Sequence, residues 1–117
     1  CVSGGSSGLG ASTARYLADK GASVCILDYD IEKANAVAQE ISGFAIQADV
    51  GDAQAVASAI TAMTRHFNIA PRIVVNCAGV ADAARIVGKN GKTSVDTFEK
   101  VIRVNLIGSY NVMTFGA

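Results

Sequence analysis

Short apolar runs alternate with amphipathic stretches along this 117-residue chain, and this alternation restricts the fold more than any other feature. The runs have the composition of strands buried on both faces, and they occupy residues 22–27, 44–48 and 73–75, after a first strand that leads into Gly4. Apolar residues at helical spacing predict helices over about 8–20, after Asp30, after Asp52 and after Ser94. The sequence therefore predicts an α/β fold of the Rossmann type, with a doubly wound parallel sheet between two helix layers.

A glycine-rich turn between the first strand and the first helix is the first candidate site. Glycines allow positive φ angles and a close approach to a pyrophosphate, and the free N–H groups of a helix N-terminus favour its negative charge. The hydroxyls of Ser6 and Ser7 add donors. The predicted phosphate-binding residues are Gly4, Ser6, Ser7, Gly8, Leu9 and Gly10. An ordinary glycine turn is the alternative.

Asp28 ends the second predicted strand, 18 residues after Gly10. A carboxylate at this place accepts hydrogen bonds from the adenosine ribose hydroxyls and repels a 2′-phosphate. Since no Arg or Lys follows until Lys33, the pattern favours NAD over NADP. The alternative is a turn or helix-capping aspartate, a role that suits Asp30 better.

Two further segments follow the third and fourth strands at the same edge of the predicted sheet. Asp49 and Val50 are expected to contact the adenosine, with the Asp49 carboxylate accepting from the adenine amino group. The small residues Cys77, Ala78 and Gly79 would let a cofactor ribose lie across the backbone. Taken alone, each segment also fits an ordinary turn at the end of a strand.

In this order, Gly4-x-x-x-Gly8-x-Gly10, Asp28, Asp49-Val50, Asn76-Cys77-Ala78-Gly79 and Asn105 resemble the short-chain dehydrogenase/reductase family over nearly the whole chain. Ser3 stands where the family usually has Thr, and Cys77 stands where Asn is commoner. Within the family, residues 77–80, the loop 81–93 and residues 98–108 are most similar to the type-2 3-hydroxyacyl-CoA dehydrogenase branch.

The resemblance implies an NAD-dependent oxidoreductase that oxidises a secondary alcohol, with 3-hydroxyacyl-CoA as the expected substrate and 3-oxoacyl-CoA as the product. It also implies a homo-oligomer, a dimer or tetramer, paired through the last helix. The alternatives are a short-chain dehydrogenase for a steroid, sugar or acyl-carrier alcohol, and a module that senses NAD without turnover. The catalytic Ser and the Tyr-x-x-x-Lys of the family are expected beyond Ala117, so the 117 residues are expected to be the dinucleotide-binding part of a single domain, truncated at both ends.

Asn105 is the one residue of the chain expected to be catalytic. The resemblance implies that it helps to hold a water that links the catalytic lysine to solvent. Asn105 follows Phe98 by seven residues, on the apolar stripe of the last helix, so its amide is expected to face the interior and to find partners there. A buried structural Asn with satisfied hydrogen bonds is the alternative.

Several motifs imitate functional patterns. Tyr16-x-x-x-Lys20 and Tyr29-x-x-x-Lys33 match the catalytic pattern of the family, but both lie on the side of the adenosine and the pyrophosphate, too far from a nicotinamide. Residues 88–93 resemble the end of a P-loop but lack its first glycine and its leading strand. Lys89 and Lys92 are expected in a solvated loop. The resemblance to the acyl-CoA branch implies that this loop lies near the CoA end of the substrate, where Lys89 or Lys92 would attract its phosphates.

Composition excludes several other classes. Ten basic and ten acidic side chains cancel and half of the residues are hydrophobic, which argues against disorder, a nucleic-acid partner or a polybasic membrane surface. No apolar run approaches the roughly 18 residues of a membrane span. Three cysteines without a C-x-x-C pair and a lone histidine, His66, predict neither a disulfide framework nor a metal site. An intracellular protein is expected, cytoplasmic or, in a eukaryote, of the mitochondrial matrix, with a small-molecule substrate.

Overall fold

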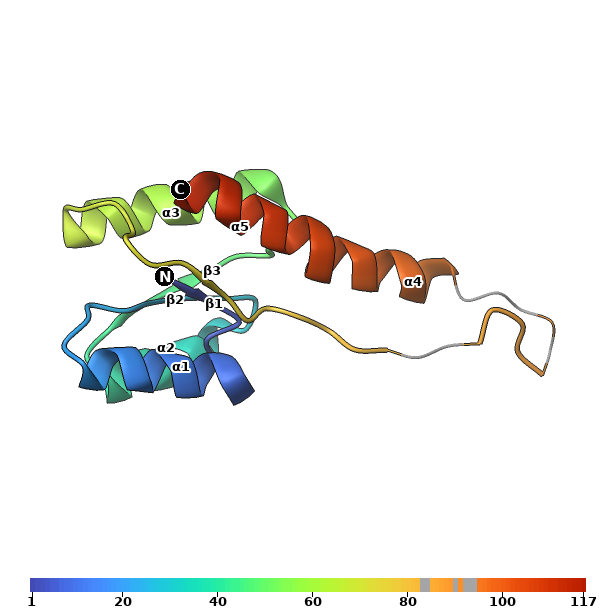
Figure 1. The fold of residues 1–117 in the computed structure, drawn as a ribbon, viewed down its shortest axis with the longest axis horizontal. Coiled ribbons are helices and arrows are strands. Elements are labelled where there is room, and N and C mark those ends of the chain that lie inside the picture. Colours follow the sequence, from blue (N-terminus) through green and yellow to red (C-terminus); the bar gives the residue numbers. More distant parts are fainter. Residues whose placement is uncertain (83–84, 90, 92–94) are drawn as a thin grey trace.

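A parallel sheet of four strands forms the centre of the molecule (Figure 1). The structure is a computed structural model, which describes residues 1–82, 85–89, 91 and 95–117. The strands are β1 (Val2–Ser3), β2 (Cys25–Asp28), β3 (Phe44–Gln47) and β4 (Val75–Asn76). Their order is β3-β2-β1-β4, with Val2 opposite Ile26 on one side and Val75 on the other. The predicted Rossmann-type α/β fold is confirmed.

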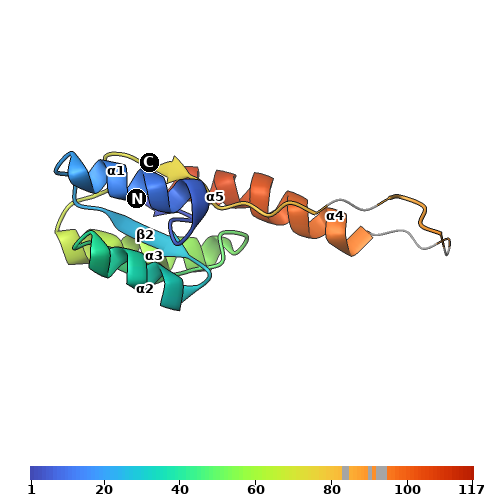
Figure 2. The same cartoon turned by 90° about the horizontal axis from the view of Figure 1, so that it is seen from below.

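Helices cover both faces of this sheet, as Figure 1 shows. Helices α1 (Gly8–Asp19) and α2 (Ile31–Glu40) lie on one face. Helix α3 (Ala53–Phe67) lies on the other face beside α5 (Gly108–Gly116). A short helix α4 (Val95–Ile102) and a π-helical segment η1 (Arg103–Ile107) run continuously into α5. Figure 2 shows α4 extending away from the sheet and its helices.

The core is divided in two by the sheet, and β2 contributes to both halves. Cys25 and Leu27 pack with α3 and Val112 of α5, whereas Ile26 packs with Val2 and the inner residues of α1 and α2. Successive side chains of a strand point to opposite faces, so a central strand covered on both sides must be apolar throughout. The unbroken apolar run that predicted this strand therefore has its expected cause.

The helix boundaries follow local chemistry that the sequence already indicates. The Asp30 side chain accepts a hydrogen bond from the Lys33 amide at 3.1 Å, and the Asp52 side chain accepts from the Gln54 and Ala55 amides. Both residues are N-caps, as predicted. Helix α1 ends at Asp19, just before Gly21, whose φ of +88° is the left-handed conformation that stops a helix.

Two predictions about the second half of the chain were wrong in part. The fourth strand begins at Val75 rather than at residue 73, and Ile73 is 55% exposed, because β4 is the edge strand of this sheet and pairs only with the two-residue β1. The apolar stripe of the last helix is not buried where it was expected. Phe98 is 66% and Leu106 is 64% exposed, since α4 and η1 lie beyond the sheet that would cover them.

Candidate functional site

A cleft of about 940 Å³ opens at the carboxyl ends of the four strands. Parallel sheets bind ligands at this edge, where the strand order reverses between β1 and β4. The structure brings all twelve predicted cofactor-binding residues together in the lining of this cleft: Gly4, Ser6, Ser7, Gly8, Leu9, Gly10, Asp28, Asp49, Val50, Cys77, Ala78 and Gly79. Residues of α4 and η1, among them Lys100 and Arg103, form a further wall that the sequence did not predict.

Three glycines of the turn, Gly4, Gly8 and Gly10, have different surroundings. A Cβ on Gly4, where φ is +64°, would lie 2.5 Å from the Ala78 amide nitrogen, and a Cβ on Gly10 would clash with the Gly4 carbonyl oxygen. These two glycines therefore allow the turn to pack against the chain after β4 and against α1. Gly8 has a φ of +50° and open space where its Cβ would stand. Gly8 also lines the cleft, so it leaves backbone there without a side chain.

The N-terminus of α1 is oriented to receive an anion. The helix begins at Gly8, and its N-cap residue, Ser7, makes no side-chain capping hydrogen bond. The first amides of a helix have no partner within the helix, and they carry its positive dipole end. Ser7, Gly8 and Leu9 all line the cleft, with the Leu9 side chain 84% exposed. An anion in the cleft can satisfy these amides.

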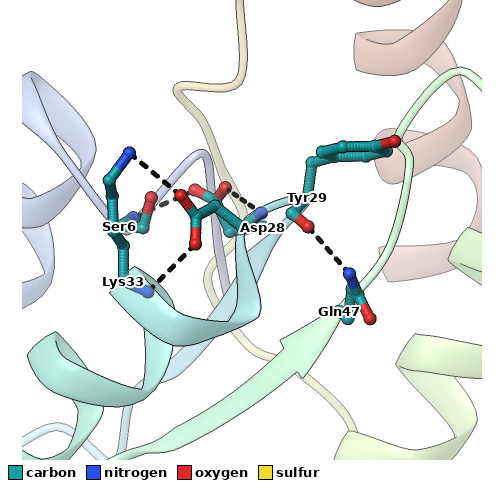
Figure 3. Close-up of polar contacts among 6 residues, drawn as sticks. Ser6, Asp28, Tyr29, Lys33 and Gln47 are labelled. Carbon is teal, nitrogen blue, oxygen red and sulfur yellow. Dashed lines mark hydrogen bonds and ion pairs between the residues drawn. The ribbon is translucent and has the colours of Figure 1, made fainter.

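Asp28 joins the end of β2 to the glycine turn, as Figure 3 shows. Its Oδ2 accepts a hydrogen bond from the Ser6 amide at 3.1 Å, and its Oδ1 accepts from the Asp30 amide at 3.0 Å. A carboxylate oxygen accepts about two hydrogen bonds, so each oxygen keeps capacity for a further donor. The half-buried Asp28 is therefore fixed in orientation and can still accept from a ligand hydroxyl.

Lys33, a cation of the cleft lining close to Asp28 in the sequence, is paired with Asp30. Lys33 Nζ lies 2.9 Å from Asp30 Oδ2 (Figure 3). The hydrogen bond with Lys33 lowers the pKa of the exposed Asp30 carboxyl, and the same bond raises the pKa of the Lys33 ammonium. This side of the cleft therefore presents the Asp28 carboxylate beside a neutralised ion pair.

The segment after β3 is held in place by the last helix. Asp49 Oδ1 accepts from the Gly51 amide at 2.8 Å, and the carbonyl of the buried Val50 accepts from Asn111 Nδ2 at 2.9 Å. A Cβ on Gly108 would lie 2.6 Å from Val50 Cγ2, so only glycine permits this close contact. Sequence reasoning missed Asn111 and Gly108, although a glycine and an asparagine within an apolar helix are signals of close packing and of a buried partner.

The segment after β4 is tied to β1 by a buried hydroxyl. Ser3 is fully buried, and its Oγ donates to Asn76 Oδ1 at 3.3 Å and accepts from the Ala78 amide at 3.4 Å. These bonds place the half-buried Cys77 and Ala78 beside the glycine turn. The hydroxyl that Ser3 shares with threonine is the part of the side chain that this contact needs.

Asn105 lies on η1 and is not among the residues that line the cleft. Its Oδ1 accepts from the Val80 amide at 2.8 Å, and its Nδ2 donates to the Val80 carbonyl at 2.9 Å. The amide thus has the partners that were expected. The expected interior position was wrong, because Asn105 is exposed on a helix that extends past the sheet. Its catalytic role stays a prediction.

The two Tyr-x-x-x-Lys motifs differ in their place relative to the cleft. Tyr16 is 63% exposed outside the cleft, with Lys20 Nζ 5.5 Å from the centre of its ring, and Tyr29 lines the cleft next to Asp28. His66 stacks on Phe44 with ring centres 3.9 Å apart. In the described parts of the chain no three His, Cys, Asp or Glu side chains gather to hold a metal. Lys92 and part of the 88–93 motif lie outside the described residues.

Known proteins are similar to this chain in sequence and fold. A family model described as short chain dehydrogenase matches residues 1–116. The chain belongs to this family. The 3-hydroxyacyl-CoA dehydrogenase type-2 of Drosophila melanogaster is 36% identical over 120 residues, which cover 99% of this chain and 47% of that protein. The resemblance to the family and to this branch is therefore confirmed, and the chain spans about half the length of the curated relative.

Two solved structures have the same fold. One, named as ribose-5-phosphate isomerase from Brucella melitensis 16M, has a TM-score of 0.86 and 32% identity and covers 98% of this chain and 43% of that one. The other, a short-chain type dehydrogenase/reductase from Mycobacterium ulcerans, has a TM-score of 0.82 and 25% identity with the same coverage. Among the described residues, no helix is long and apolar enough to cross a membrane.

Proposed function

We propose that the full-length protein is an NAD-dependent oxidoreductase that oxidises a secondary alcohol, and that residues 1–117 are the dinucleotide-binding part of its Rossmann domain. The observation that carries the proposal is the place of Asp28, whose carboxylate is bonded to the Ser6 amide of the glycine turn. Family membership agrees, since short-chain dehydrogenases typically use nicotinamide cofactors.

The residues present fit a dinucleotide. The uncapped start of α1 and the bare backbone at Gly8 suit the diphosphate, and the two free acceptor positions of Asp28 suit the hydroxyls of the adenosine ribose. Asp49 and Val50 would bound the adenine, and Cys77, Ala78 and Gly79 would support the ribose on the other side of the turn. When bound, the dinucleotide supplies the nicotinamide ring as the hydride acceptor. The residues named above would hold and orient the dinucleotide.

Charge at the ribose end favours NAD over NADP. A 2′-phosphate there would meet the Asp28 carboxylate, and the neighbouring Lys33 is engaged by Asp30. Burying like charges together costs several kcal/mol, so the unmodified ribose is the better ligand.

For the substrate, we propose 3-hydroxyacyl-CoA, oxidised to 3-oxoacyl-CoA. The support is the name of the Drosophila melanogaster relative. We also propose that Asn105 contributes to the proton relay and that the protein is a homo-oligomer paired through its last helix.

The experiment compares kcat/KM for NAD and NADP in the full-length protein, with 3-hydroxybutyryl-CoA as substrate. The parent should prefer NAD, and Asp28→Ser should reduce that preference by at least about tenfold because the repulsion of the 2′-phosphate is removed. Asp19→Ser removes the same charge at the exposed end of α1 and should leave the preference unchanged. If the parent has equal kcat/KM values for NADP and NAD, the role assigned to Asp28 is wrong.

A further inference from the structure

Arg103 is the first residue of η1 and lies against the segment that follows β3. A Cβ on Gly51 would stand 2.9 Å from Arg103 Cγ and 3.1 Å from Arg103 Nε. The arginine stem therefore rests on the bare Gly51 backbone. The same Gly51 position is 3.2 Å from Asp49 Oδ1, so the guanidinium and the Asp49 carboxylate border one short stretch of backbone.

The π-helical turn accounts for this placement. In a π-helix the residues five apart share a face, whereas in an α-helix they diverge. Arg103 and Gly108 are five apart, and both pack on the segment of residues 49–51, Arg103 on Gly51 and Gly108 on Val50. Since Asn111 also bonds to the Val50 carbonyl, the helix is locked in this register and the guanidinium is held at the cleft wall.

The guanidinium has free bonding capacity. Within the described residues, the exposed Arg103 side chain makes neither an ion pair nor a hydrogen bond, and Arg103 lines the cleft together with Asp49 and Val50. A planar cation can stack on the face of an aromatic ring, and arginine does so more readily than lysine. The neighbouring Asp49 carboxylate is an acceptor suited to the amino group at the edge of such a ring.

We infer that Arg103 is a specificity-determining residue of the cofactor site, which stacks on the face of the adenine base while Asp49 accepts from the edge of that base. The inference rests on the proposed function, because it requires an adenine dinucleotide in the cleft. The inferred role of Arg103 adds a second wall to the adenine site, contributed by the last helix. It also agrees with the glycine at position 51, where a Cβ would displace the arginine side chain.

The test measures dissociation constants of the full-length protein by calorimetry for AMP, NAD, NADP and nicotinamide mononucleotide. Arg103→Ala should raise the dissociation constants for AMP and NAD by about fivefold, which corresponds to about 1 kcal/mol of binding free energy. Nicotinamide mononucleotide, which also carries one phosphate but no adenine, should bind unchanged. The decrease in adenine absorbance that accompanies stacking should diminish in the variant. Arg103→Lys, which keeps the charge but not the plane, should behave like Arg103→Ala, and Arg65→Ala outside the cleft should behave like the parent.

Several results would overturn the inference while leaving the proposed function in place. These are unchanged AMP affinity in Arg103→Ala, full affinity in Arg103→Lys, and equal losses for AMP and nicotinamide mononucleotide. A larger loss of affinity for NADP than for NAD in Arg103→Ala would assign Arg103 to the 2′-phosphate instead, and would also overturn the inference. Failure of the parent protein to bind AMP or NAD at all would refute the proposed function itself.

Discussion

At the scale of single residues, the glycines of the turn separate stability from binding. Gly4 combines a φ of +64° with a packed contact to Ala78, whereas Gly8 has a φ of +50° and open space. Gly4→Ala should therefore cost at least about 3 kcal/mol of unfolding free energy, from backbone strain and a clash together. Gly8→Ala should cost about 1 kcal/mol but weaken NAD binding about tenfold, because its methyl group occupies the diphosphate's space.

Urea unfolding and NAD titration of the two full-length variants provide the measurement. Gly21→Ala is a suitable control, because Gly21 also has a positive φ, +88°, and open space but lies at the far end of α1. It should match Gly8→Ala in lost stability and match the parent in NAD affinity. Equal NAD affinities of Gly8→Ala and Gly21→Ala would mean that the turn does not approach the diphosphate.

Cys25 gives a prediction about pH. Burial raises the pKa of its thiol from 9.0 to about 11, and its side chain is 2% exposed. A pKa that is higher in the folded state means that unfolding favours the thiolate, so stability is complete below pH 9 and falls as the pH approaches 11. Ionisation of this one thiol should lower the free energy of unfolding by about 2 kcal/mol at a pH of about 10.5, compared with a pH of about 8. Urea unfolding of the parent and of Cys25→Ala at both pH values measures the difference, and equal pH slopes would contradict it.

At the scale of elements, the docking of α5 on the segment after β3 depends on one buried amide. Asn111 is 7% exposed and its Nδ2 donates to the Val50 carbonyl. Asn111→Ala leaves that carbonyl without its donor, which should cost about 1–3 kcal/mol of unfolding free energy. It should also weaken AMP binding, because Val50 and Asp49 lose their support. Thr114→Ala, at an exposed position of the same helix, serves as the control. Unchanged AMP affinity in a folded Asn111→Ala protein would show that the segment keeps its shape without α5.

The elements also show what the sequence can and cannot predict. Asp30 and Asp52 indicate where their helices begin, because an N-cap acts within one helical turn. The position of Asp28 in the cleft is predictable because the carboxyl ends of parallel strands share one edge of the sheet. The π-helical turn at residues 103–107 and the contact of Arg103 with Gly51 depend on how two distant segments meet, so no local pattern encodes them. The edge position of β4 likewise follows from which strands are present, and it left Ile73 outside the strand that its apolar run predicted.

At the scale of the whole molecule, an apolar surface runs along α4, η1 and α5. Phe98, Leu106, Tyr110 and Met113 are each more than half exposed along this continuous helix. Exposed large apolar side chains are typical of surfaces that contact another protein, which agrees with the proposed pairing of copies through this helix. In the full-length protein, Phe98→Asp with Leu106→Asp should therefore lower the mass found by sedimentation to that of a smaller oligomer or a monomer. Tyr16→Asp, which changes an equally exposed aromatic residue on α1, should leave the mass unaltered.

If the double variant keeps the parent's mass and its unfolding free energy, the surface is not an interface. If its mass is kept but its stability falls by several kcal/mol, the same chain covers the helix, because two buried carboxylates without partners are costly wherever the covering surface comes from.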